Sequence, residues 1–256
     1  MRAIIAFLKK EITEQMRTGK VLFLGILFIL FGIMNPAVAK LTPWLMEQLS
    51  DSLAESGMII TEVNVTALDS WMQFYKNIPM ALIAFVLLEA GIFTKEYRSG
   101  TLVLSLTKGL KRSHVVLAKT VTLILLWTVS YWLCYGITYA YTVYYWDNSI
   151  VSYLMPSVVL WWVFGLWIVS LMVLFSTLCS SNTGVLVGTG GVVLASYLVA
   201  MLPKVVRYLP TLLADGSSLI YGLKEPREYL SALIVTSVTG LSVLAVSFVI
   251  FNKKQL

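Results

Sequence analysis

The chain has 256 residues, of which 58% are hydrophobic and only 12% are charged. A soluble domain usually carries about twice that charged fraction, so the composition excludes an ordinary soluble enzyme and predicts an integral membrane protein. The net charge of +6 comes from 19 Lys and Arg residues against 13 Asp and Glu residues. We expect this excess to mark membrane topology and not nucleic-acid binding.

The N-terminal segment, residues 1–19, has the pattern of an amphipathic helix. Charged residues throughout this segment exclude the short apolar centre of a cleavable signal peptide. We therefore expect a helix that lies flat on the inner leaflet and leads into the first span, either as a plain anchor or in a regulatory role. Its apolar residues recur at helical spacing: Ile4, Ile5, Leu8, Ile12 and Met16.

Six apolar segments are long enough to cross a hydrocarbon core about 30 Å thick. Backbone groups in lipid must be satisfied within the segment, and the runs lack period-2 alternation, so helices are expected and a barrel is not. The first helix should end near Asn35-Pro36, with a short outer-leaflet helix beginning around Trp44. The predicted fold is all-α, a single membrane domain over residues 1–256. The spans lie at about 20–38, 76–94, 115–142, 154–178, 184–201 and 231–251.

Basic residues are distributed unevenly between the loops. If both termini lie inside, 13 of the 19 Lys and Arg residues face the cytoplasm, so the positive-inside rule predicts cytoplasmic termini. Aromatic clusters around Trp71 and Tyr145 fall where the second and third spans meet the outer interface. These clusters fit an aromatic belt, and a π-rich substrate path is the alternative.

Two further segments carry structural signals. Residues 202–230 are apolar but interrupted by Pro203, Pro210 and Gly216, so we expect an extracellular re-entrant hairpin before the last span, a plausible gate over a cavity. Gly184 and Gly188 form a G-x-x-x-G pair that favours close helix packing, either within the chain or between subunits.

Motifs for catalysis are absent from the sequence. There is no G-x-x-x-x-G-K-[ST] loop, so the chain is not expected to hydrolyse ATP by itself. His114 is the single histidine, which disfavours a metal cluster, a catalytic triad and an intramembrane enzyme. Cys134 and Cys179 lie in or at the end of apolar segments and are interpreted as small hydrophobic residues. We predict no catalytic residues and no metal site.

Glu89 is the one carboxylate placed inside an apolar span. Ionisable groups within a membrane are costly and are candidates for a functional site. Glu89 lies about one and a half helical turns before Lys95, so it is interpreted either as the partner of a basic residue at the inner interface or as an intramembrane polar site. The second interpretation makes an ion-coupled secondary transporter or channel the alternative function.

The segment from Glu96 to Lys119 combines basic residues with a Gly-Thr pair between two spans. Glu96-x-x-x-Gly100-Thr101-Leu102, Leu106-Thr107-Lys108, Arg112 and Leu117-Ala118-Lys119 resemble the cytoplasmic stretch of ABC-2 type transporter permeases. That stretch runs E-x-x-x-G-T-L, then L-L-x-x-P-x-S-R, then L-G-K. Gly109 replaces the usual proline and Ala118 the usual glycine, but the spacing is preserved. The six-span layout and the outer hairpin are also similar to that family.

The resemblance implies a coupling helix at about 97–108, in a cytoplasmic coupling loop at 95–114, which inserts into a groove on a separate ATPase. Glu96 near the start of this helix and basic residues near its end suit the helix dipole. The residues assigned to ATPase coupling are Glu96, Arg98, Gly100, Thr101, Leu102, Leu106, Lys108 and Arg112.

The same resemblance implies the permease subunit of an ATP-driven exporter in a bacterial or archaeal plasma membrane. Its partners would be membrane lipid, two copies of an ABC ATPase subunit, and a second permease in a homodimer or heterodimer. ATP and Mg²⁺ are expected on the ATPase, with no cofactor bound by this chain. Few internal charges favour amphipathic or hydrophobic cargo, such as a peptide toxin, an antimicrobial peptide or a lipid-like molecule.

Overall fold

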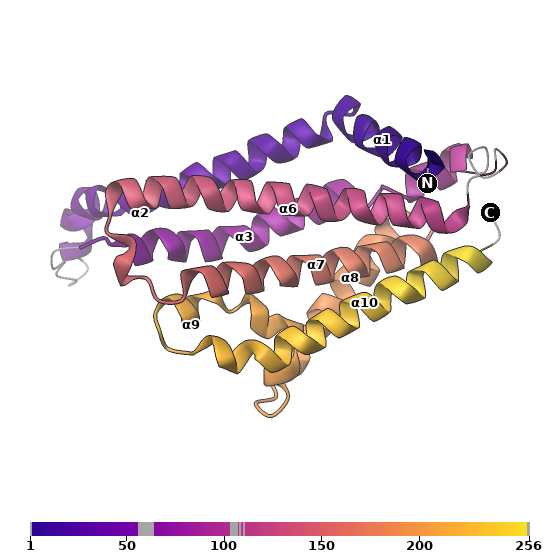
Figure 1. The fold of residues 1–256 in the computed structure, drawn as a ribbon. Coiled ribbons are helices and arrows are strands. Elements are labelled where there is room, and N and C mark those ends of the chain that lie inside the picture. Colours follow the sequence, from indigo (N-terminus) through magenta and orange to yellow (C-terminus); the bar gives the residue numbers. More distant parts are fainter. Residues whose placement is uncertain (1, 56–63, 103–106, 108, 110, 255–256) are drawn as a thin grey trace.

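The computed structural model describes residues 2–55, 64–102, 107, 109 and 111–254. In these residues every regular element is a helix, and six helices are long and apolar enough to cross a membrane. The predicted all-α membrane fold is therefore confirmed. Figure 1 shows the long helices side by side in one elongated bundle, with the N- and C-termini at the same end.

The first two helices are α1, Arg2–Arg17, and α2, Lys20–Glu55. The prediction that the first span ends near Asn35-Pro36 is wrong, because α2 continues through Pro36 and Pro43. The outer-leaflet helix expected around Trp44 is the continuation of α2.

A neighbouring helix explains why Pro36 does not end α2. Proline lacks the N–H that would bond to the carbonyl four residues earlier, which here is that of Gly32. The Thr138 hydroxyl donates to this Gly32 oxygen at 3.1 Å. Asn35 is fully buried and donates in turn to Thr138 at 3.0 Å. Side chains from a packed helix thus satisfy the backbone group that proline leaves free.

The remaining long helices form the body of the bundle around α7, which packs against α3, α6, α8 and α10. Its core is rich in aromatic side chains, and Trp71, Trp127 and Tyr131 are fully buried. α3 begins nine residues before the predicted second span and ends five residues before its predicted end, and α6 is three residues longer than the predicted third span at each end. α7, α8 and α10 agree closely with the predicted spans. The bounds are α3 Ala67–Glu89, α4 Thr94–Ser99, α6 Arg112–Tyr145, α7 Leu154–Leu178, α8 Asn182–Val199 and α10 Leu230–Lys253.

Between α8 and α10 the chain folds back onto the bundle in short helices. Trp161 of α7 donates its indole N–H to the Ala214 carbonyl at 3.0 Å, which fixes the segment against the core. A further short helix, η1 Asn148–Ile150, joins α6 to α7. The short helices before α10 are η2 Val206–Tyr208, η3 Pro210–Ala214, α9 Gly216–Ile220 and η4 Pro226–Tyr229.

The G-x-x-x-G pair packs within the chain. A Cβ atom on Gly188 would lie 2.2 Å from Phe175 Cδ1, and one on Gly184 would lie 2.9 Å from Cys179 Cβ. These contacts let α8 approach the end of α7 closely. Of the two interpretations left open by the sequence, packing inside the subunit accounts for both glycines.

Candidate functional site

The expected coupling helix is interrupted. α4 begins at Thr94 and ends at Ser99, and its C-cap Gly100 has a left-handed φ of 67°, a conformation that glycine adopts at little cost. Thr101, Leu102 and Thr107 are again helical. A single helix over 97–108 is therefore wrong in its bounds, because the backbone turns at Gly100. Leu106 and Lys108 lie outside the described residues.

Glu96 belongs to a buried ion cluster and not to an exposed docking surface. Its side chain is 8% exposed, and Oε2 lies 3.1 Å from Nζ of Lys119, whose side chain is 1% exposed. Lys119 also contacts Glu11 Oε2 at 2.9 Å and donates to the Ile92 carbonyl at 2.8 Å. Lys10 of α1 forms a second ion pair with Glu96. The cluster thus ties α1, α4 and α6 together.

Three carboxylates of this cluster converge at one point. The carboxylates of Glu11, Glu14 and Glu96 offer oxygens within 4.8 Å of one another. Lys10 Nζ lies among them, 3.1 Å from Glu11 and 2.9 Å from Glu14. Its ammonium group therefore takes the position between the carboxylates that a cation would otherwise fill. Burial would lower the pKa of Lys10, but hydrogen bonds to Glu96 and Glu14 outweigh it and raise that pKa well above its usual range.

Glu89 is fully buried beside this cluster. Gln15 of α1 donates to its Oε2 at 2.8 Å, and Lys20 Nζ, at the start of α2, lies 3.1 Å away. The sequence left open whether Glu89 pairs with a basic residue or forms an intramembrane polar site. The structure places a basic residue beside it, and this residue is Lys20. Lys95 is exposed. A cavity of about 20 Å³ lined by Gln15 and Lys20 adjoins the pair, and one water molecule would fit it.

The other predicted coupling residues differ in exposure. Arg98 and Thr101 are exposed, whereas Leu102 is 1% exposed and packs into the core. Arg112 donates to the Phe251 carbonyl at 3.4 Å and bonds to the next carbonyls at the end of α10, where a positive charge suits the helix dipole.

Sequence reasoning missed the partners of Glu96. Lys119 lies inside the predicted third span, and a charged residue within a span is a signal for a buried partner. Lys10 and Glu11 carried no comparable signal, because charged residues on an amphipathic helix usually face solvent.

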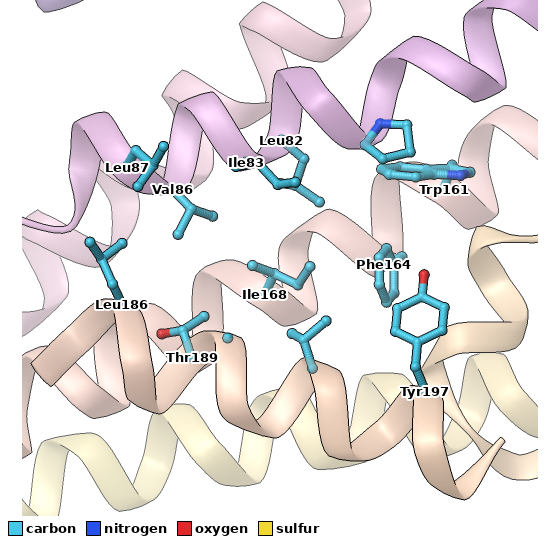
Figure 2. A pocket seen from close by; sticks show the side chains of 13 residues that line it. Leu82, Ile83, Val86, Leu87, Trp161, Phe164, Ile168, Leu186, Thr189 and Tyr197 are labelled. Atoms are coloured by element: carbon cyan, nitrogen blue, oxygen red, sulfur yellow. The ribbon is translucent and has the colours of Figure 1, made fainter. Parts of the chain in front are cut away.

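A cleft of about 320 Å³ lies between α3, α7 and α8. Figure 2 shows α3 and α8 facing each other across it, with side chains of α7 between them. Its volume falls within the roughly 300–1,000 Å³ of small-molecule sites. We call it the α3–α8 cleft; the side chains labelled in Figure 2 that line it are Leu82, Ile83, Val86, Leu87, Trp161, Phe164, Ile168, Leu186, Thr189 and Tyr197.

The α3–α8 cleft is almost entirely apolar. Its hydroxyl groups are those of Thr189 and Tyr197. Thr189 is 2% exposed, and its Oγ1 has no hydrogen-bond partner among the described residues. A buried hydroxyl without a partner is costly, so a ligand that offers a hydrogen-bonding group would be favoured at this point. The sequence did not predict the cleft, because its Leu, Ile, Val and Gly residues are also typical of lipid-facing helices.

The fold thus defines a multi-pass helical membrane protein with an ion cluster at one end and an apolar cleft within its spans. A family model described as "ABC-2 family transporter protein" matches residues 5–219. The chain belongs to this family, as the cytoplasmic motif predicted. It is therefore the membrane component of an ABC transporter; members of this family are membrane subunits that lack an ATPase domain, and the family implies an ABC ATPase partner.

A relative has a similar length. The "Uncharacterized transmembrane protein YxlG" of Bacillus subtilis (strain 168) is 22% identical over 252 residues, which cover 96% of this chain and 95% of that protein.

Proposed function

We propose that the chain is the permease subunit of an ATP-driven exporter for amphipathic or hydrophobic cargo, such as a peptide toxin, an antimicrobial peptide or a lipid-like molecule. The observation that carries this proposal is the apolar α3–α8 cleft within the membrane-spanning helices. A charged group entering this cleft would lose its hydration without compensation, whereas an apolar chain or ring would not. The membrane would be a bacterial or archaeal plasma membrane, with both termini in the cytoplasm.

The coupling loop, residues 95–114, would contact the ATPase. Arg98 and Thr101 are exposed and would contact the partner, while Glu96 and Leu102 hold the loop against the bundle. Two permease chains, identical or related, would bind two ATPase subunits. Closure of the ATPases on ATP would displace the loops and switch access to the pathway.

The ion-coupled alternative depends on Glu89 as a transport site. Its carboxylate accepts from Gln15 and pairs with Lys20 at the inner end of α3. These contacts favour a structural role, since a buried carboxylate with a basic partner is stabilised in place. The α3–α8 cleft, in contrast, has no carboxylate in its lining.

Affinity purification of the tagged chain in mild detergent tests the partner. We expect an ABC ATPase to co-purify, and Arg98→Glu to weaken its recovery while Lys40→Glu, a change of the same sign that lies outside the coupling loop, does not.

In liposomes the complex should hydrolyse ATP faster when an amphipathic peptide is added. ATP hydrolysis insensitive to every such peptide would contradict the cargo class. Proton-driven flux by the chain without an ATPase would favour the alternative.

A further inference from the structure

The turn between α7 and α8 lies directly against α4. Thr94, the first residue of α4, is fully buried, and its hydroxyl donates to Oδ1 of Asn182, the first residue of α8. A Cβ atom on Gly91 would lie 3.2 Å from Asn182 Nδ2, so the amide sits closely over the backbone before α4. Tyr97 of α4 donates to the Ser176 carbonyl at 3.3 Å. The start of α8 is therefore held by the helix that leads into the coupling loop.

α8 is sparsely anchored along the rest of its length. Only Val185 and Thr189 of its 18 residues are buried. It packs on α7 and η3, and the α3–α8 cleft separates Leu186 and Tyr197 from the α3 wall. A helix with few buried contacts needs little free energy to shift.

Gly188 lets α8 approach α7 closely. A Cβ there would lie 2.2 Å from the Phe175 ring, so this contact is a natural pivot. At 1.5 Å rise per residue, Asn182 lies about 9 Å from the pivot and Tyr197 about 14 Å on the other side. A displacement of Asn182 would therefore be reversed and enlarged about 1.5-fold at the Tyr197 end of the cleft.

We propose that Asn182 is a positioning residue through which α4 moves α8, so that displacement of the coupling loop changes the width of the α3–α8 cleft. The inference rests on the proposed function, because it assumes an ATP-driven displacement of that loop. The Thr94–Asn182 hydrogen bond transmits the movement, and the pivot at Gly188 converts it into a tilt of α8 away from or toward α3.

Spin labels on the two walls of the cleft test this link. The labels are placed at Ile83→Cys and Val193→Cys, in a background where Cys134 and Cys179 are replaced by serine. The full complex with its ATPase is reconstituted, and the distance between labels is measured by pulsed electron paramagnetic resonance without nucleotide and after trapping with ATP and vanadate. We expect a shift of roughly 1–5 Å, the range of interhelical switching movements.

Asn182→Ala and Thr94→Val should abolish this shift, whereas Thr94→Ser, which keeps the hydroxyl, should retain it. Thr94→Val removes the same hydrogen bond from the other side, so the test holds even if Asn182→Ala fails to assemble. Co-purification and ATP hydrolysis verify that each complex is intact. A shift that persists in both Asn182→Ala and Thr94→Val would overturn the link but leave the proposed function standing. Labels that do not respond to nucleotide in the parent complex would overturn both the link and the cleft as the pathway.

Discussion

Lys119 of α6 and Glu96 of α4 form a buried ion pair, with Nζ 3.1 Å from Oε2. The two residues stand at opposite ends of the motif that resembles the ABC-2 cytoplasmic stretch. The first and last charged residues of the motif are therefore in direct contact, although 23 positions separate them in the sequence. Glu96 thus holds α4 against α6 and α1.

Loss of Lys119 should be strongly destabilising. Among the described residues, Lys119→Met leaves buried Glu11 and Glu96 with Lys10 as their remaining ion-pair partner, and removal of one partner from a buried ion pair costs about 3–5 kcal/mol. Lys111→Met, at an exposed position just before α6, should change stability by less than about 0.5 kcal/mol. Unfolding in detergent measures both. Equal stability of the two variants would contradict the structural role of the ion cluster.

The sequence predicts the spans well because a hydrocarbon core demands long apolar helices wherever they pack. It fails at Pro36 because the group that satisfies the Gly32 carbonyl, Thr138, comes from a helix about a hundred residues away. The sequence around Pro36 predicts the loss of a backbone hydrogen bond, but it does not predict the distant Thr138 hydroxyl that replaces this bond.

The candidate site was predictable only in part. The motif indicated the family, but the burial of Glu96 depends on Lys10 and Lys119, which belong to two other helices. The α3–α8 cleft exists because α8 lies at a distance from α3. The sequence does not predict this distance, because apolar residues on α8 are expected whether that face contacts lipid or lines a cleft.

Two glycines of α8 should respond in opposite ways to alanine. Gly188→Ala would bring a methyl group within 2.2 Å of Phe175, and such overpacking costs about 1–3 kcal/mol. Gly191→Ala meets nothing within 4 Å and should be neutral or stabilise α8 by up to about 1 kcal/mol, because alanine favours the helix. Thermal unfolding of the two variants in the same detergent checks this. Destabilisation of similar size in both would mean that Gly188 does not form the close contact.

The segment before α10 should loosen in acid. Burial would raise the pKa of Asp215, but hydrogen bonds from Lys224 and Ser218 outweigh it and hold that pKa below its ordinary value of 3.8. A carboxyl whose pKa is lower in the folded state contributes stability that is complete above the ordinary value and is lost as pH falls through the folded value. Proteolysis at Lys224 and Arg227 by an acid-tolerant protease should therefore increase below about pH 4. Asp215→Asn should abolish most of this pH dependence, and an unchanged profile in that variant would contradict it.

Filling the α3–α8 cleft should block cargo. Val193 lines the cleft from α8, and Val193→Trp would occupy much of the space that an apolar ligand needs. Leu194→Trp adds the same ring on an adjacent side chain that is 62% exposed and does not line the cleft. We expect the amphipathic peptide to lose at least about tenfold in apparent affinity for the Val193 variant, equivalent to about 1.4 kcal/mol, with little change for the Leu194 variant. The peptide concentration that half-maximally stimulates ATP hydrolysis by the reconstituted complex measures this. Equal affinity in both variants would place the cargo path elsewhere, because Val193 lines the cleft and Leu194 does not.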